Sequence, residues 1–214
     1  LSQEVNPEQK KLDDEIKFDT IRLPTDAEPI RTNPYLIERG IIDVPHTLYE
    51  APKSMKDRVI VPIKWQGKLI GYVARAMTDI SPKYFAQVQP GTLFNLDNQH
   101  WSRKFVILVE GIFDAIQIDG VAILGSEIAH KQKLQIDALN RKVIVVPDRD
   151  RAGTKLIDQA SEWGWSVSMP PWGPDIKDVN DAVIKYGKIL TIQAILKYTH
   201  DSKAKIKVNE KLWL

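Results

Sequence analysis

The second half of the chain alternates short apolar runs with helical patterns, and acidic residues follow three of these runs. The segments are VILVEGIFDA (106–115), VIVVPDRDRAG (143–153) and PDIKDVND (174–181). A strand–helix–strand order of this kind favours a parallel sheet with right-handed crossovers. Open α/β sheets bind ligands beyond the carboxyl ends of their strands, so we expect the acids to gather there. This pattern restricts the fold class more than any other feature of the sequence.

The expected elements follow from apolar periodicity and from turn residues. In the second half, strands are predicted at 105–109, 121–125, 142–146 and 165–170. Helices are predicted after the first strand, from a Ser126 cap to about Leu139, from Gly153 onward, and at 179–187. Upstream, we expect a short helix at 34–41, a hairpin at 57–77 around Gln66-Gly67, and a loop at 81–96 that ends in a short strand.

Charge is distributed unevenly along the chain, although the net charge is only +2. Residues 1–30 carry eight acids and four bases, whereas residues 51–104 carry nine bases and three acids. A basic segment beside an acidic site is suited to holding a polyanion next to metal ions, but a solvated charged face is an equally good interpretation. We predict an acidic polar arm (1–30), a basic subdomain (31–104), an α/β domain (105–190) and a C-terminal extension (191–214). The last segment, KAKIKVNEKLWL, is expected to dock a partner or to pack as a terminal strand.

Composition excludes several classes of protein. The 214 residues are 43% hydrophobic and 27% charged, which is ordinary for a globular chain. No apolar stretch is long enough for a membrane span, and the first residues lack the features of a signal peptide. The chain has no cysteine, which excludes disulfides and thiolate zinc sites. We therefore expect a cytoplasmic protein with no membrane partner.

A pair of aspartates lies directly after the apolar run at 142–146. Asp148 and Asp150 flank one arginine in what is expected to be an extended turn. Two neighbouring carboxylates repel each other, and a divalent cation removes the repulsion and keeps both ionised. A lone Asp-x-Asp at a strand end is also typical of a turn or helix cap, and that interpretation stays open for the pair.

Acidic residues after other predicted strands, together with Asp148 and Asp150, make up a predicted metal site. Glu110 ends one apolar run, Asp114 follows one helical turn later, and Asp178 lies in a loop after another strand. Carboxylate oxygens are the ligands that Mg²⁺ and Mn²⁺ prefer. We predict that Glu110, Asp148, Asp150 and Asp178 hold one or two such ions, about 4 Å apart if two, with Asp114 assisting. Glu110 is expected to act as a metal ligand or as a general acid/base.

Three of these segments resemble the signatures of the toprim domain, a fold shared by bacterial-type primases, topoisomerases and some nucleases. They are Val109-Glu110-Gly111 with Asp114, the run DRDRAG (148–153), and Lys177-Asp178-Val179-Asn180. The resemblance covers about residues 105–187. It implies an α/β fold with a central, mostly parallel sheet flanked by helices.

The upstream segment resembles the part of bacterial primase catalytic cores that precedes their toprim domain. There, a strand hairpin is followed by Gly-x-x-x-Arg and then Pro-Lys-Tyr, as in residues 58–87 of this chain. PYLIERGI (34–41) resembles the Tyr-Leu-x-x-Arg-Gly element that opens the family's core. On this match Arg75 and Lys83 fall where the family places basic residues for template or nucleotide phosphates. A smaller N-terminal α+β basic subdomain is thereby implied.

The chain departs from the family pattern in ways that affect the expected chemistry. Asn180 replaces a frequent Asp, which is expected to weaken the third metal locus. Arg149 replaces Gly inside the acidic doublet and is expected to add a cation near the metals. The sequence holds neither the cysteines of a zinc ribbon nor a helicase Gly-x-x-x-x-Gly-Lys-[Ser/Thr] motif. Initiation is then expected to need a further domain or a partner.

The resemblance implies the catalytic core of a DNA primase, a nucleotidyltransferase that synthesises RNA primers. Its expected partners are a single-stranded DNA template, NTPs and a replicative helicase, fused or recruited. A toprim nuclease would use the same acids to hydrolyse a phosphodiester. A module with a decayed site would bind nucleic acid or a replisome without catalysis. A Rossmann-like phosphatase domain would supply the acids but leaves residues 58–87 unexplained.

Overall fold

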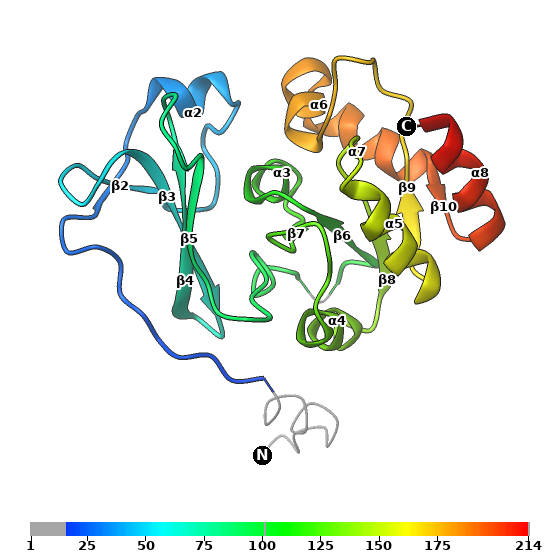
Figure 1. The fold of residues 1–214 in the computed structure, drawn as a ribbon, viewed down its shortest axis with the longest axis horizontal. Coiled ribbons are helices and arrows are strands. Elements are labelled where there is room, and N and C mark those ends of the chain that lie inside the picture. Colours follow the sequence, from blue (N-terminus) through cyan, green and yellow to red (C-terminus); the bar gives the residue numbers. More distant parts are fainter. Residues whose placement is uncertain (1–15, 101, 214) are drawn as a thin grey trace.

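A computed structural model of the chain describes residues 16–100 and 102–213. Two sheets lie side by side, one in the first half of the chain and one in the second (Figure 1). The N-terminal sheet is antiparallel, with its strands in sequence order. Its elements are β1 (Glu28–Pro29), α2 (Pro34–Glu38), β2 (Tyr49–Ala51), β3 (Met55–Trp65), β4 (Lys68–Ala76) and β5 (Tyr84–Gln87).

The predicted hairpin and the predicted short helix are confirmed. β3 and β4 pair around Gln66 and Gly67, both of which have positive φ (50° and 73°), as a tight turn matching the strand twist requires. α2 begins at Pro34, and the Asn33 side chain accepts a hydrogen bond from the Tyr35 amide. The segment preceding β1 lies along this sheet, with the Ile21 amide bonded to the Leu69 carbonyl.

The loop predicted at 81–96 contains a strand that the sequence pattern did not reveal. Residues 84–87 form β5, which pairs with β4 and leaves its own outer edge unpaired among the described residues. All of β5 is exposed, so no apolar alternation marks it in the sequence. The short strand expected at the end of the loop is reduced to a bridge between Phe94 and Ala122.

The C-terminal sheet has the order β10-β9-β8-β6-β7, with β6 to β9 parallel and β10 antiparallel. This confirms the predicted α/β architecture with a mostly parallel sheet. Its strands are β6 (Phe105–Val109), β7 (Val121–Ala122), β8 (Lys142–Val145), β9 (Ser166–Ser168) and β10 (Thr199–His200). Its helices are α3 (Ile112–Ile118), α4 (His130–Asp137), α5 (Gly153–Glu162), α6 (Val179–Tyr186), α7 (Lys188–Lys197) and α8 (Lys203–Trp213).

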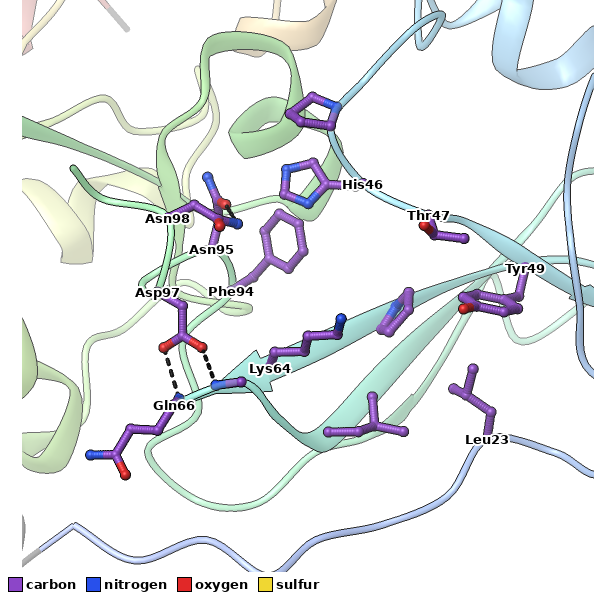
Figure 2. A pocket seen from close by; sticks show the side chains of 14 residues that line it. Leu23, His46, Thr47, Tyr49, Lys64, Gln66, Phe94, Asn95, Asp97 and Asn98 are labelled. Carbon is purple, nitrogen blue, oxygen red and sulfur yellow. Dashed lines mark hydrogen bonds between the residues drawn. The ribbon is translucent and has the colours of Figure 1, made fainter.

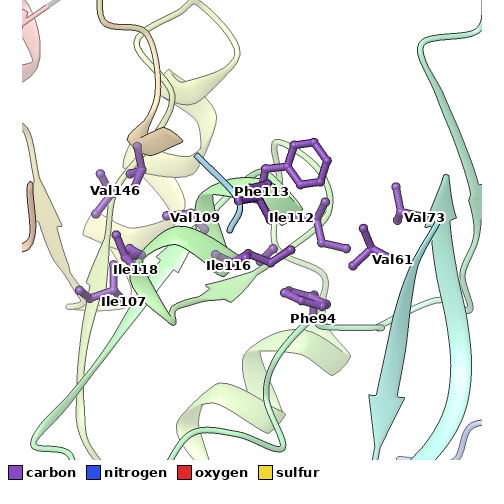
Figure 3. Close-up of a cluster of buried hydrophobic side chains, with 14 of the residues drawn as sticks. Val61, Val73, Phe94, Ile107, Val109, Ile112, Phe113, Ile116, Ile118 and Val146 are labelled. Carbon is purple, nitrogen blue, oxygen red and sulfur yellow. The ribbon is translucent and has the colours of Figure 1, made fainter. Parts of the chain in front are cut away.

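Helices cover both faces of the C-terminal sheet. α3, α6 and α7 contribute to the core on one face, and α4, α5 and α8 contribute to the core on the other. The first core continues into the N-terminal sheet. Figure 3 shows Val61 and Val73 of β3 and β4 near Ile112 and Phe113 of α3. This shared core joins the two sheets and brings β4 and β5 close to the strand ends that carry the acids.

Two expectations about the second half are wrong. Ser126 does not cap a helix: α4 begins at His130, and the Gln132 side chain accepts a hydrogen bond from the Ala129 amide. Residues 124–127 form a bend, with Leu124 at a positive φ of 60°, so the helix starts only after Ile128 and Ala129. The expectation that the segment KAKIKVNEKLWL packs as a terminal strand is also wrong, because residues 203–213 form α8.

Residues 1–15 of the predicted acidic arm lie outside the described residues. Within the described part of the arm, Ile16 is buried. No helix within residues 16–100 and 102–213 is long and apolar enough to cross a bilayer. The proposed division into segments at 30, 104 and 190 stays a prediction.

Candidate active site

Strand ends and helix starts bring four predicted acids into one region. Glu110 directly follows β6, and Asp148 lies just beyond β8, which pairs with β6 in parallel. Asp114 is in the first turn of α3, and Asp178 is the N-cap of α6. Parallel strands end at the same edge of a sheet, so the local order of strand, acid and helix is enough to collect these groups.

Glu110 and Asp148 are in direct contact. The Asp148 amide donates a hydrogen bond of 3.1 Å to Glu110 Oε1. Burial, together with the negative charges of Asp114, Glu110, Asp178 and Asp150, raises the pKa of Asp148 to about 9. Burial also raises the pKa of Glu110. These carboxyl groups are thus held together in a setting that disfavours their ionised forms unless a cation is present.

Asp114 is the most buried acid of the region, with 6% of its surface exposed. Its Oδ1 accepts a 2.7 Å hydrogen bond from the Asn180 amide, at the start of α6. Burial and the nearby charge of Asp178 both raise the pKa of Asp114. Gly111 leaves space for this carboxylate, because a Cβ at residue 111 would lie 2.2 Å from Asp114 Oδ2.

Asp150 and Asp178 also act as helix caps. Asp150 Oδ1 accepts hydrogen bonds from the amides of Ala152 (2.8 Å) and Gly153 (3.0 Å), at the start of α5. Asp178 Oδ1 accepts a 2.8 Å bond from the Asp181 amide. The capping interpretation of the Asp148/Asp150 pair therefore holds for Asp150. Asp150 is exposed, at the margin of the site, whereas burial raises the pKa of Asp178.

A basic and aromatic surface of the N-terminal sheet faces the acids. Arg75 of β4 is 6% exposed, and its Nε donates a 3.1 Å hydrogen bond to the Tyr35 hydroxyl. Its guanidinium lies 4.3 Å from the centre of the Tyr84 ring. Tyr84, Glu110 and Asp148 line the same cavity of about 400 Å³, between β4, β5 and the acidic loops. The two sheets thus form a cleft with carboxylates on one side and an aromatic ring backed by a cation on the other.

The donor chemistry of the acidic side fits a hard divalent cation. The groups are all carboxylates, partly or fully buried, and they repel one another. Within residues 16–100 and 102–213, no three acidic or histidine side chains converge closely enough to enclose an ion. Glu110, Asp114, Asp148 and Asp178 supply the right ligand type, and their raised pKa values describe the metal-free state.

Comparison with known proteins shows that the sequence of this chain is similar to those of DNA primases. A DNA primase from Thermotoga maritima is 32% identical over 151 residues, covering 61% of this chain and 26% of the primase. The chain thus spans about a quarter of the length of this relative. No family model matches the chain.

Solved structures share the fold over most of the chain. A DnaG primase catalytic domain bound to single-stranded DNA matches with a TM-score of 0.55 and 21% identity, covering 77% of this chain and 61% of that one. The primase fragment of the bacteriophage T7 primase-helicase matches with a TM-score of 0.53 and 18% identity, covering 76% and 69%. The chain has the fold of a primase catalytic core. The predicted resemblance to bacterial and phage primases is confirmed.

Lys83 is placed differently from Arg75 in this primase-type core. It precedes β5, and its backbone carbonyl accepts a hydrogen bond from the Ala76 amide. Its exposed side chain has no hydrogen-bond or ion-pair partner among the described residues and does not line the acidic cavity. The structure therefore brings Arg75, but not the Lys83 side chain, into contact with the aromatic groups of the cleft.

Arg39, which was not among the predicted site residues, lies near Asp178. Its positive charge lowers the pKa of Asp178, against the larger effect of burial. Asn180 holds it in place: the Asn180 side chain donates a 3.0 Å hydrogen bond to the Arg39 carbonyl. The position of Arg39 in PYLIERGI (34–41), the segment that resembles the start of the family's core, is the sequence signal by which it could have been found. Asn180, expected only to weaken a metal locus, is 2% exposed and connects α2, α3 and α6 through Arg39 and Asp114.

Two charged residues near the acids have other partners. Asp175, which shares a loop with Asp178, forms a 2.7 Å ion pair with Lys185, and that contact lowers its pKa. The expectation that Arg149 adds a cation beside the metals is wrong. Its Nε donates a 2.8 Å hydrogen bond to the Trp213 carbonyl, so its guanidinium lies against the end of α8.

A larger cavity of about 700 Å³ lies away from the acids, beside the hairpin of β3 and β4 (Figure 2). Lys64, His46 and Phe94 are among its lining residues, and Asp97 there accepts hydrogen bonds from the amides of Gln66 and Gly67. None of the acids of the candidate site lines it. Of the candidate-site acids, Glu110 and Asp148 line the smaller cavity between the sheets.

Proposed function

We propose that the chain is the catalytic core of a DNA primase and performs template-directed synthesis of RNA primers. One observation carries the proposal: buried, mutually repelling carboxylates share a single cleft with Tyr84, whose ring lies against the Arg75 guanidinium. Nucleotidyl transfer needs both a place for cations and a surface for an anionic substrate. The similarity to primases over both halves of the chain supports this assignment.

Glu110, Asp148 and Asp178 would hold one or two Mg²⁺ or Mn²⁺ ions, with buried Asp114 assisting and exposed Asp150 at the margin. When bound, such ions stabilise the charge on a transferring phosphoryl group. The protein residues keep the carboxylates buried and oriented: the Asp148 amide holds Glu110, and the Asn180 amide holds Asp114. Because cation binding requires ionised ligands, it would release the protons that the buried acids retain.

Arg75 and Tyr84 would bind the template or the nucleotide on the opposite side of the cleft. Arg75 is held by the Tyr35 hydroxyl, so its guanidinium is presented in a fixed orientation. Tyr84 keeps 47% of its surface exposed while one face of its ring lies near that guanidinium. An exposed ring backed by a cation is suited to stacking on a base. Lys83 would contact phosphates from the solvent side.

The proposed partners are a single-stranded DNA template, NTPs and a replicative helicase. A primase domain of this fold has been solved with single-stranded DNA, and another is a fragment of a primase-helicase. We propose that the present chain works within such an assembly, with the helicase fused or recruited.

The test is primer synthesis on single-stranded DNA with labelled NTPs and Mg²⁺ or Mn²⁺. Asp148→Asn and Glu110→Gln preserve side-chain shape while removing charge, and Asp175→Asn is the control because Asp175 is paired with Lys185 outside the cleft. Short RNA products from wild type and Asp175→Asn, lost in the other two variants, are expected. Metal-dependent cleavage of the template without synthesis would instead identify a nuclease. DNA binding that EDTA does not change, with neither activity, would identify a binding module.

A further inference from the structure

Arg149 lies between Asp148 and Asp150, yet its side chain leaves the acidic site. Nε donates a 2.8 Å hydrogen bond to the Trp213 carbonyl, and Nη1 donates bonds to the carbonyls of Trp172 (3.1 Å) and Gly173 (3.5 Å). One guanidinium thus joins three segments that are distant in the sequence: the acidic loop after β8, the loop that leads to Asp178, and the end of α8.

The end of α8 is well suited to hold this arginine. The last carbonyls of a helix have no partner within the helix and carry partial negative charge, so a guanidinium there is favourable. Trp213 is 5% exposed, and its Nε1 donates a 3.1 Å hydrogen bond to the Pro170 carbonyl, where the loop toward Asp178 begins. Trp213 therefore anchors that loop by its side chain and Arg149 by its backbone.

α8 is attached to the acidic region at a second point. Lys207 of α8 forms an ion pair with Asp158 of α5, and Ile206 is buried in the core that α5 shares. The same α5 starts at the amides that Asp150 caps. The loop carrying Asp148 is therefore supported by α8 through both Arg149 and α5.

The backbone of Arg149 completes the connection. Its amide donates a 2.7 Å hydrogen bond to the Lys177 carbonyl, directly before Asp178. Side chain and amide together fix the loop of Asp148 to the loop of Asp178 at two places. The distance between these two carboxylates is consequently set by contacts that do not involve the carboxylates themselves.

We propose that Arg149 is a positioning residue whose guanidinium fork, rather than its charge, holds the two acidic loops against α8 at the spacing that cation binding needs. The inference rests on the proposed function for the identity of the bound cation. A lysine keeps the charge but presents a compact ammonium in place of a planar fork, so it cannot reproduce contacts to three separate carbonyls. Arg149→Lys thus separates geometry from charge.

The test compares Arg149→Lys and Arg149→Ala with Arg151→Ala, a matched control from the same loop. Arg151 is exposed, and its side chain has no hydrogen-bond or ion-pair partner among the described residues. Mn²⁺ affinity is measured by titration, and amide hydrogen exchange is measured in EDTA. Both Arg149 variants are expected to bind Mn²⁺ about 10–100-fold more weakly, as for lost outer-sphere support of metal ligands. In both Arg149 variants the backbone amides of residues 149 and 181 are expected to exchange faster than in wild type, while the amides of β6 keep their wild-type rates. Arg151→Ala is expected to match wild type in Mn²⁺ affinity and in exchange.

Two results would overturn the inference: Mn²⁺ affinity fully retained in Arg149→Lys, or unchanged exchange in both loops of Arg149→Ala. Should Arg149→Ala not fold, Trp213→Phe replaces it, because it keeps the carbonyl that Arg149 contacts and removes only the bond to Pro170. Faster exchange confined to the loop toward Asp178 is then expected, and unchanged exchange there refutes the connection. Wild type that binds no Mn²⁺ refutes the proposed function alone, since the exchange pattern still decides the role of Arg149.

Discussion

Replacing Asp148 by asparagine is expected to stabilise the metal-free chain at high pH. Burial and neighbouring acids raise the pKa of Asp148 from 3.8 to about 9. Between these pH values the folded chain holds a proton that the unfolded chain has lost. The contribution of this proton is fully present below pH 4 and is lost as pH rises toward 9, so the free energy of unfolding falls over that window. Asparagine has the same shape and no charge to bury.

The magnitude follows from the size of the pKa change. A difference of about 5 pKa units corresponds to about 7 kcal/mol between the two protonation states. Asp148 is only partly buried, and the effective dielectric constant near a protein surface is high, so less than half of this is expected. We therefore expect the wild type to lose about 2–3 kcal/mol of stability between pH 5 and pH 8.5 through this residue.

The assay is urea unfolding in EDTA at pH 5 and pH 8.5. Asp148→Asn should lose less stability than wild type over this interval and should exceed wild type at pH 8.5. Asp175→Asn is the control, because Lys185 lowers the pKa of Asp175 and no gain at high pH is expected. Added Mn²⁺ should stabilise wild type more than Asp148→Asn. A difference between Asp148→Asn and wild type that is the same at both pH values would refute the reasoning.

Three further predictions concern the cleft and the hairpin. Gly111→Ala should reduce Mn²⁺ affinity at least tenfold in titrations, because the new Cβ would lie 2.2 Å from Asp114 Oδ2 and displace it. Tyr84→Ala should weaken single-stranded DNA binding in anisotropy titrations by about 1–3 kcal/mol, whereas Tyr84→Phe, which keeps the ring over Arg75, should not; equal losses would contradict stacking. Gly67→Ala should lower the free energy of unfolding by about 1 kcal/mol through its φ of 73° alone, since no atom would crowd the Cβ.

Local signals in the sequence were enough for most of the parallel sheet and for the hairpin. The apolar runs ending at Val109 and Val146 are buried on both faces and therefore read as continuous hydrophobic strands. The elements that the sequence did not predict are those whose conformation depends on contacts with distant parts of the chain. β5 is exposed and exists because β4 offers it an edge. Residues 203–213 are helical because Ile206 and Trp213 pack into the apolar core that covers one face of the C-terminal sheet.

Glu110 and Asp148 were identifiable because they closely follow β6 and β8, and parallel strands end together; Asp114 and Asp178 lie at the starts of α3 and α6. The sequence therefore predicted which carboxylates lie near one another, and the divalent-ion site stays a prediction. It did not determine which cations face them. Arg149 lies within the acidic motif but contacts the end of α8. By contrast, Arg39, at the end of α2, lies near Asp178, and Arg75 of β4 lies against the Tyr84 ring. Long basic side chains take partners that only the packed chain supplies, and their direction was decided by the tertiary structure alone.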